Sequence, residues 1–186
     1  MYDRDQCEQD QQSLAFISVG SNIHPEHTIP AALSTLSQSV RVTASSTFYQ
    51  TKPIGPAGQP DYVNGIWQID TTLTPDTIKS TLLLPIETQL GRVRSADKYA
   101  PRPIDLDLIL YDDLCMDNAV LQLPHPDIDR PFVHIPIREL LLTATTQPEI
   151  TQKMLCLLPK YSHADNPGHV LDGLTRRLQQ LIIKLG

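Results

Sequence analysis

The spacing of apolar residues over the first 111 positions predicts six elements of secondary structure. Apolar runs and two-residue alternation are typical of strands, and apolar residues every three or four positions are typical of helices. The predicted strands are 14–19, 40–50, 62–73 and 104–111, and the predicted helices are 28–36 and 74–90. The order β-α-β-β-α-β is typical of an α+β fold with a ferredoxin-like sheet, in which both helices pack on one face.

Particular residues bound and interrupt the two predicted helices. Thr28 and Thr74 can each cap a helix whose first turn contains a proline. Pro85 lies inside the apolar stripe of the second helix, where it removes a backbone hydrogen bond. We therefore expect this helix to be kinked or interrupted.

The residues outside this core have a weaker pattern. Residues 1–13 are polar and without periodicity, so we expect a disordered tail. A short strand near 120–123 and a helical turn near 136–142 are predicted further along the chain. Apolar residues recur at helical spacing over 168–185, which predicts an amphipathic helix that packs on the core or, alternatively, binds a partner. We expect residues 14–186 to form a single domain.

Composition and charge narrow the class of protein. The chain has 186 residues, of which 40% are hydrophobic and 19% are charged, as in ordinary globular proteins. No apolar run approaches the ~20 residues of a membrane helix, and the polar N-terminus does not resemble a secretory signal. The formal net charge of −6 argues against a general nucleic-acid binder. Three widely spaced cysteines give no disulfide framework, so we expect reduced thiols in a cytoplasmic protein.

Two aspartates on the last predicted strand are the first candidates for chemistry. Side chains alternate along a strand, so Asp105 and Asp107 share one face with Ile109 and Tyr111, while the even positions 104–110 face the helices. The two aspartate Cα atoms would lie ~7 Å apart. A magnesium ion binds one or two carboxylates and completes its shell with water and phosphate oxygens. The alternative is a pair of solvated aspartates, because D-x-D alone is a weak motif.

A basic loop just before this strand favours the metal interpretation. Its cations are Arg92, Arg94, Lys98 and Arg102, opposed within that span only by Asp97. Arginine forks match the geometry of phosphate oxygens. Together with the aspartates, the loop predicts a nucleotide–metal site more readily than a solvated basic loop. The chain has no G-x-x-x-x-G-K-[ST] motif, so a P-loop site is excluded.

The proline-rich loop 51–61 and the start of the next strand form a second candidate surface. Tyr62 and Asn64 lie on one face of that strand, next to Ile54 and rigid prolines. An aromatic ring and an amide suit a flat, hydrogen-bonding heterocycle, although an ordinary turn would use the same residues. His125, between two prolines, is by itself a structural or surface histidine.

These segments together resemble the 6-hydroxymethyl-7,8-dihydropterin pyrophosphokinase family. The longest matching motif runs from Gly91 to Tyr111. The other matching segments, in the same order as in the family, are Phe16–Asn22, Ser46–Thr51, Gly55–Pro56, Gln59–Asn64, Leu123–His125 and Arg130–Phe132. The resemblance covers about residues 14–145. At four positions the residue differs from the one familiar in the family: Lys52, Lys98, Tyr99 and Ala100. These differences bear on loop motion and on affinity for the ligands, not on the chemistry.

The resemblance implies a role for each matching site residue. Asp105 and Asp107 would bind two Mg²⁺ ions that bridge the triphosphate of ATP. Residues that would hold or close over the phosphates are Arg92, Arg94, Lys98, Arg102 and Arg130, with Arg92 and Arg102 as the catalytic pair. Glu87 and His125 would contact the nucleotide. Tyr62 and Phe132 would sandwich the pterin ring, and Thr51, Ile54 and Asn64 would read its edge. The turn 20–22 would shape the adjacent wall.

The resemblance also implies the reaction and its setting. Pyrophosphate would pass from ATP to 6-hydroxymethyl-7,8-dihydropterin, giving AMP and the pterin diphosphate in folate biosynthesis. Small molecules would be the only partners of a monomer that binds neither nucleic acid nor membrane. Two alternatives are a nucleotidyltransferase, in which a Gly-Ser turn lies shortly before the D-x-D, and a non-catalytic ligand-binding module. The wide separation of Ser21 from Asp105 counts against the first.

Overall fold

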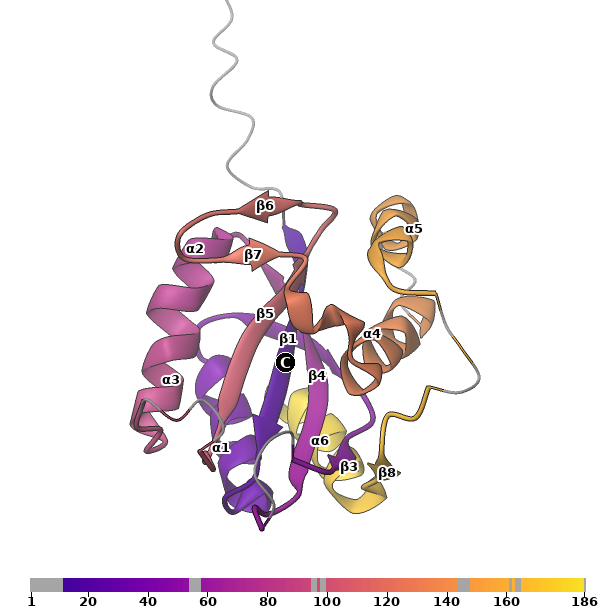
Figure 1. Cartoon of the computed structure of the whole chain (residues 1–186). Helices are drawn as coiled ribbons and strands as arrows, with labels where there is room; N and C mark the ends of the chain where they lie inside the picture. The colour runs from indigo at the N-terminus through magenta and orange to yellow at the C-terminus, as the bar shows by residue number, and fades with distance from the viewer. Residues whose placement is uncertain are drawn as a thin grey trace, which may run out of the picture.

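The computed structural model describes residues 12–53, 58–94, 97, 100–143, 148–160, 162 and 165–185 (Figure 1). The strands are β1 (Ser13–Ser21), β2 (Arg41–Ser45), β3 (Tyr49–Thr51), β4 (Tyr62–Thr71), β5 (Asp105–Tyr111), β6 (Met116–Asp117), β7 (Gln122–Leu123) and β8 (His169–Val170). The helices are α1 (Pro25–Leu36), α2 (Pro75–Thr77), the π-helical η2 (Ile78–Leu83), α3 (Leu84–Gln89), the 3-10 turn η3 (Pro126–Asp129), α4 (Pro131–Thr143), α5 (Pro148–Leu157) and α6 (Asp172–Leu185). Most of the predicted tail, residues 1–11, lies outside the described residues.

An antiparallel sheet organises the chain. In the described residues it has six strands in the order β5-β1-β4-β3-β8, and β2 pairs with the remaining length of β4. All of its pairings are antiparallel. The predicted α+β class is therefore confirmed. The predicted strand 40–50 is divided into β2 and β3, because Ser46 leaves the strand path and its hydroxyl accepts a hydrogen bond from the Ile66 N–H at 2.9 Å.

The two helical segments of the predicted core, α1 and α2–α3, pack on one face of the sheet as predicted, and later helices cover part of the other face. On one face α1 packs on β1, α6 on β2, and η2 and α3 on β5, around a core cluster that includes Ala15, Ile17 and Val19. On the other face α4 packs on β4 and α5 packs on α4 (Figure 1), and their apolar residues join a second core cluster that includes Phe16 and Ile66. The reason is that β1 and β4 carry apolar side chains on both faces, so both need cover. Because α4 and α5 cover only one end of the second face, the opposite end remains accessible.

A register shift in β5 decides which of its side chains reach the accessible face. Leu108 pairs with Ile17 and Leu110 with Phe16, so one extra residue, Ile109, is accommodated in β5 between them. Strand alternation therefore fails at this β-bulge. Leu110 packs on the second face and Tyr111 on the first, which is the reverse of the predicted alternation. Asp105 and Asp107 precede the bulge and keep their predicted face.

The interrupted helix predicted at Pro85 is confirmed as three consecutive segments. Thr74 caps α2 as predicted, accepting a hydrogen bond from the Thr77 N–H. The chain then widens into η2, in which the Leu84 N–H bonds the carbonyl of Lys79, and α3 begins with Pro85 in its first turn. A π-helical turn accommodates the missing N–H and the ring of proline. The predicted C-terminal helix is confirmed as α6, whose Leu178 and Ile182 join the first core cluster.

We predict that Gly65→Ala destabilises the fold. Gly65 in β4 lies against the fully buried ring of Phe48, and an added Cβ would lie 2.5 Å from two ring carbons. Overpacking of this kind costs about 1–3 kcal/mol. Equilibrium unfolding in urea measures the loss, with Gly173→Ala as the control, because a Cβ at Gly173 meets no atom within 4 Å. Equal midpoints for the two variants would contradict the prediction.

Candidate functional site

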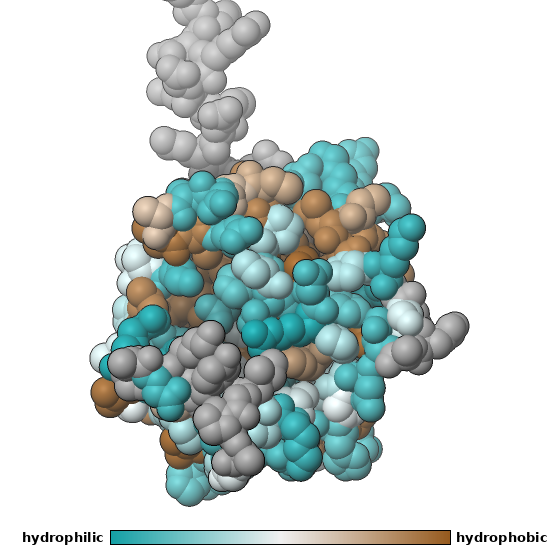
Figure 2. All heavy atoms as spheres, viewed as in Figure 1, coloured by the Kyte–Doolittle hydropathy of each residue, from teal (hydrophilic) through white to brown (hydrophobic). Residues whose placement is uncertain are grey.

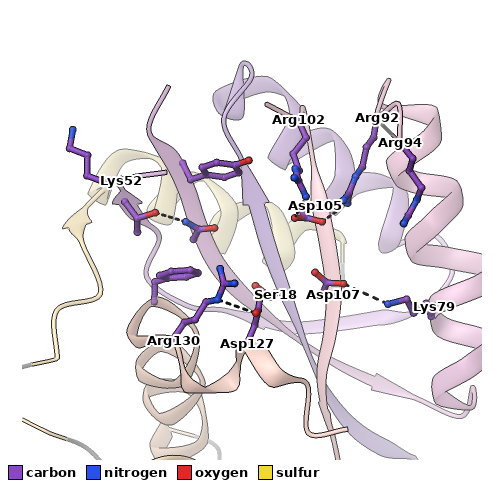
Figure 3. A pocket seen from close by; sticks show the side chains of 14 residues that line it. Ser18, Lys52, Lys79, Arg92, Arg94, Arg102, Asp105, Asp107, Asp127 and Arg130 are labelled. Carbon is purple, nitrogen blue, oxygen red and sulfur yellow. Dashed lines mark hydrogen bonds and ion pairs between the residues drawn. The ribbon is translucent and has the colours of Figure 1, made fainter. Parts of the chain in front are cut away.

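A cavity of about 400 Å³ lies on the accessible part of the sheet, beside the first residues of β4 and β5. It is lined by Ser18, Thr51, Lys52, Tyr62, Asn64, Lys79, Arg92, Arg94, Arg102, Asp105, Asp107, Asp127, Arg130 and Phe132. Figure 2 shows polar residues gathered across the middle of this face, with apolar residues more frequent toward its upper edge. In Figure 3 the charged residues from η2 and β5 lie on one side of the cavity, and Lys52 lies on the other.

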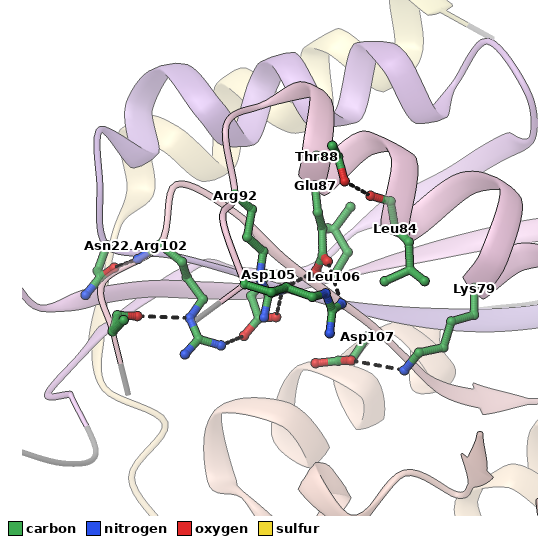
Figure 4. A network of polar contacts seen from close by, with 12 residues as sticks. Asn22, Lys79, Leu84, Glu87, Thr88, Arg92, Arg102, Asp105, Leu106 and Asp107 are labelled. Atoms are coloured by element: carbon green, nitrogen blue, oxygen red, sulfur yellow. Dashed lines mark hydrogen bonds and ion pairs between the residues drawn. The ribbon is translucent and has the colours of Figure 1, made fainter. Parts of the chain in front are cut away.

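Asp105 is held by two arginines that flank the basic loop. One carboxylate oxygen accepts from Nη1 of Arg92, and the other accepts from Nη1 of Arg102 at 3.0 Å (Figure 4). The backbone of Arg102 is itself fixed by the turn after β1. Its N–H donates to Oδ1 of Asn22 at 2.7 Å, and the Asn22 N–H donates to its carbonyl at 3.2 Å. The turn thus places a guanidinium at the cavity wall.

Glu87 lies behind the arginines. Its side chain is only 3% exposed, and it accepts from Arg92, from Nη2 of Arg94 at 3.2 Å and from the Leu106 N–H at 2.8 Å. Burial raises the pKa of Glu87, although the hydrogen bond from Leu106 and the charge of Arg92 act in the opposite direction. The carboxylate therefore anchors the arginines to β5, and its predicted contact with a nucleotide stays a prediction.

Asp107 has weaker partners than Asp105. Its carboxylate is 30% exposed and lies 3.7 Å from Nζ of Lys79. Desolvation and then the charge of Asp105 raise its pKa, while His125, Lys79 and Arg92 act to lower it. Asp107 is thus a partly buried carboxylate that a nearby cation would stabilise, and it lies beside a second carboxylate. Paired carboxylate oxygens are ligands that Mg²⁺ prefers. Among the described residues no three or more His, Cys, Asp or Glu side chains cluster as a metal site, so an ion here would need non-protein ligands as well.

Lys79 is a site residue that helical periodicity does not reveal. In a regular helix it follows the buried Ile78 and points away from the core, so it would be assigned to solvent. The π-helical turn of η2 changes the rotation per residue and brings its ammonium into the cavity. The sequence analysis also did not select Ser18, which pairs with Asp107 in the sheet. Its position as a polar residue within the apolar run of β1 could have marked it as a site residue. Lys52 and Asp127 complete the missed residues.

The other end of the cavity has an aromatic and amide character. Tyr62 and Phe132 line it, and Nδ2 of Asn64 donates to Oγ1 of Thr51 at 2.8 Å. The guanidinium of Arg130 lies 5.8 Å from the centre of the Phe132 ring and is paired with Asp127 at 3.0 Å. This compartment could hold a flat ring between aromatic faces with hydrogen-bonding groups at its edge.

The structure thus brings most of the predicted site residues into one cavity. The predicted residues that line it are Thr51, Tyr62, Asn64, Arg92, Arg94, Arg102, Asp105, Asp107, Arg130 and Phe132. His125 does not line this cavity: its backbone N–H donates to the Ile109 carbonyl at 2.9 Å, and its Nδ1 accepts from the Asp127 N–H at 3.2 Å. Ile54 and Lys98 lie outside the described residues.

In this α+β protein, arginines and carboxylates at one end of a cavity and a ring-sized aromatic compartment at the other match the chemistry of a ligand-binding site for phosphate groups and a flat ring. The family model described as 7,8-dihydro-6-hydroxymethylpterin-pyrophosphokinase (HPPK) matches residues 16–142. The chain belongs to this family.

Relatives from several organisms agree with this assignment. The chain is 39% identical over 130 residues to the 2-amino-4-hydroxy-6-hydroxymethyldihydropteridine pyrophosphokinase of Haemophilus influenzae, covering 68% of this chain and 80% of that protein. It is 38% identical to the Synechocystis protein of the same name, covering 68% and 65%. It is also 34% identical to the mitochondrial folate synthesis bifunctional protein of Pisum sativum, covering 73% of this chain but only 27% of that protein.

In the described residues, no helix has the length and apolar character needed to cross a membrane.

We predict opposite effects on stability when the two aspartates are neutralised. Asp105→Asn removes the carboxylate that Arg92 and Arg102 share, although Arg92 keeps Glu87, and should lower the free energy of unfolding by about 1–3 kcal/mol. Asp107→Asn removes a desolvated, repelled charge and should raise it by up to ~1 kcal/mol at pH 7.

Urea unfolding with a metal chelator present measures both effects. The raised pKa means that folded Asp107 takes up a proton at a higher pH than the unfolded chain does. The gain from Asp107→Asn should therefore shrink as the pH falls through that pKa, because wild-type Asp107 is then neutral in the folded chain. Equal destabilisation by both substitutions would show that the partners of Asp105 and Asp107 are equivalent.

Proposed function

We propose that this chain transfers a pyrophosphoryl group from ATP to the hydroxymethyl oxygen of 6-hydroxymethyl-7,8-dihydropterin, releasing AMP, in folate synthesis. The observation that carries the proposal is the division of one cavity into an end with arginines and carboxylates and an end with aromatic and amide groups. Such a cavity can hold a polyphosphate and a heterocycle side by side, as the reaction requires. Family membership supports the same reaction.

Asp105 and Asp107 are the residues that would hold two magnesium ions. When bound, the ions would neutralise phosphate charge and orient the β-phosphorus for attack. Two observations support a metal ion here. Both carboxylates face the cavity from one strand, and Asp107, whose pKa is raised by desolvation and by Asp105, has Lys79 as its ion-pair partner only at 3.7 Å. Arg92 and Arg102 are already bonded to Asp105, so they lie where they could turn from the carboxylate to phosphate oxygens.

The remaining predicted residues divide between the two substrates. Arg94, Lys98, Arg130 and His125 would act on the nucleotide, and Glu87 would orient the arginines. Tyr62 and Phe132 would hold the pterin between them, with Asn64, Thr51 and Ile54 at its edge. The described residues offer no strong candidate for a general base, so catalysis would consist of alignment and charge stabilisation.

The arrangement of the core supports the ferredoxin-like assignment within the α+β class. The chain crosses from β1 through α1 to β2, and again from β4 through α2–α3 to β5. In the resulting sheet β1 lies between β4 and β5. β3, β8 and the β6–β7 pair are additions to that plan. We propose a cytoplasmic, monomeric enzyme whose ligands are small molecules.

Incubation of the protein with ATP, Mg²⁺ and the pterin tests the proposed reaction. AMP and a pterin diphosphate in equal amounts are expected, and chelation of the metal should stop the reaction. Release of inorganic pyrophosphate would instead indicate nucleotidyl transfer. No turnover, with both ligands bound, would indicate a binding module.

We predict that Arg102→Ala lowers the single-turnover rate at saturating substrates by about 10²-fold or more, while it weakens binding of a non-hydrolysable ATP analogue much less. The guanidinium is fixed through its backbone to Asn22 and lies at Asp105, so it is aimed at the transferring group before substrate binds. Rapid-quench kinetics and calorimetry separate the two effects. If ATP affinity falls and the rate at saturation does not, Arg102 only docks the nucleotide.

A further inference from the structure

The C-terminal part of the chain, beyond the residues matched by the family model, passes directly beside the ring-binding end of the cavity. β8 pairs with β3 through Tyr49–Val170 and Gln50–His169, and the Leu171 N–H donates to the Phe48 carbonyl at 2.9 Å. A second cleft of about 470 Å³ lies between this segment and β3. Its walls include Thr51, Lys52 and Phe132, which also line the main cavity. The two clefts therefore share one partition.

Gly168 is the point of closest approach between the C-terminal segment and this partition. Its φ is +117°, a conformation that other residues rarely adopt. A Cβ there would lie 2.4 Å from the Gln50 carbonyl oxygen and 3.0 Å from Cγ2 of Thr51. The Gly168 N–H donates to Oδ1 of Asn166 at 2.9 Å, which fixes the turn. Only a residue without a side chain lets the backbone lie against Thr51 in this way.

Thr51 transmits this contact to the site. Its methyl group packs toward Gly168, and its hydroxyl accepts the hydrogen bond from Asn64 at 2.8 Å. A β-branched side chain has few χ1 states, so a contact on its methyl group also fixes its hydroxyl. Asn64 is 7% exposed and faces the cavity, so the orientation of its amide depends on this acceptor.

We propose that Gly168 is a positioning residue for the heterocyclic substrate: it holds Thr51, and through Thr51 it orients the Asn64 amide toward the edge of the ring. The C-terminal segment is then part of the substrate site. The inference rests on the proposed function, because the heterocycle is the pterin of that reaction. The ATP end of the cavity lies on the other side and does not depend on this contact.

Steady-state kinetics of Gly168→Ala test the proposal, with Gly173→Ala as the matched control. Gly168→Ala should raise the Michaelis constant for the pterin by about 3–10-fold, the loss expected for one disturbed hydrogen bond. The affinity for a non-hydrolysable ATP analogue and kcat should stay within about twofold. Gly173→Ala should change none of these values. Equal weakening of pterin and ATP analogue would show a general structural defect and overturn the proposal.

Two further variants keep the test decisive if Gly168→Ala folds poorly. Asn166 is exposed, so Asn166→Ala loosens the turn at Gly168 without altering the core and should raise the pterin Michaelis constant about twofold. Thr51→Val removes the acceptor but keeps the side-chain shape. If Gly168 acts through Thr51, Asn166→Ala should have no further effect in the Thr51→Val background. Fully additive losses, or an unchanged Michaelis constant for Asn166→Ala, would overturn the proposal.

The proposed function is tested separately by the control proteins in the same experiment. Turnover of ATP and pterin by the wild type and by Gly173→Ala supports the reaction, whatever Gly168→Ala does. Absence of turnover in both would reject the reaction. Direct binding of the pterin to Gly168→Ala and to the wild type, followed by calorimetry, would then still decide whether Gly168 shapes a heterocycle site.

Discussion

Two carboxylates two residues apart on one strand require cations, and this requirement accounts for the positive groups that approach β5. Asp105 and Asp107 face the same side of β5, where burial and then the charge of Asp105 raise the pKa of Asp107. Arg92, Arg102 and Lys79 approach from three different segments to offset that charge. Glu87 in turn ties Arg92 to the backbone of β5 through the Leu106 N–H. Each of these contacts joins a loop or helix to the sheet.

The uneven cover of the sheet determines where such a cluster can exist. β1 is apolar on both sides over most of its length, so α4 and α5 must cover its second face near Phe16. Toward the end of β1 the residues on that face become smaller or polar, with Ser18 and Gly20 opposite Asp107 and Asp105. Cover there would bury charges without partners, which is costly. The cavity lies at this change from apolar to polar residues.

Local pattern predicted the main elements, the two aspartates and the basic loop before them, because these signals depend on residues close together in sequence, whereas Glu87, Arg130 and Phe132 were reached only through the family resemblance. Alternation placed Asp105 and Asp107 on one face, and Thr74 and Pro85 marked where the second helical segment begins and breaks. The β-bulge at Ile109 could not be predicted, because it depends on how β5 matches β1 across the sheet. Lys79 was missed because Pro85 predicts an interruption of the helix but does not specify that the interruption takes the form of a π-helical turn. The contact between Gly168 and Thr51 joins residues far apart in sequence, and no local signal reports it.

The charges at the arginine-lined end of the cavity nearly cancel. Among the described side chains, the positive charges exceed the negative ones by a small amount. The cations are Lys79, Arg92, Arg94 and Arg102, and the carboxylates are Glu87, Asp105 and Asp107. A triphosphate with about four negative charges, accompanied by two divalent ions, is close to neutral as a unit. Binding would therefore exchange partners among existing charges and change the total charge of the site little. An exchange of this kind gives weak long-range attraction, so the rate of nucleotide association would depend only slightly on ionic strength.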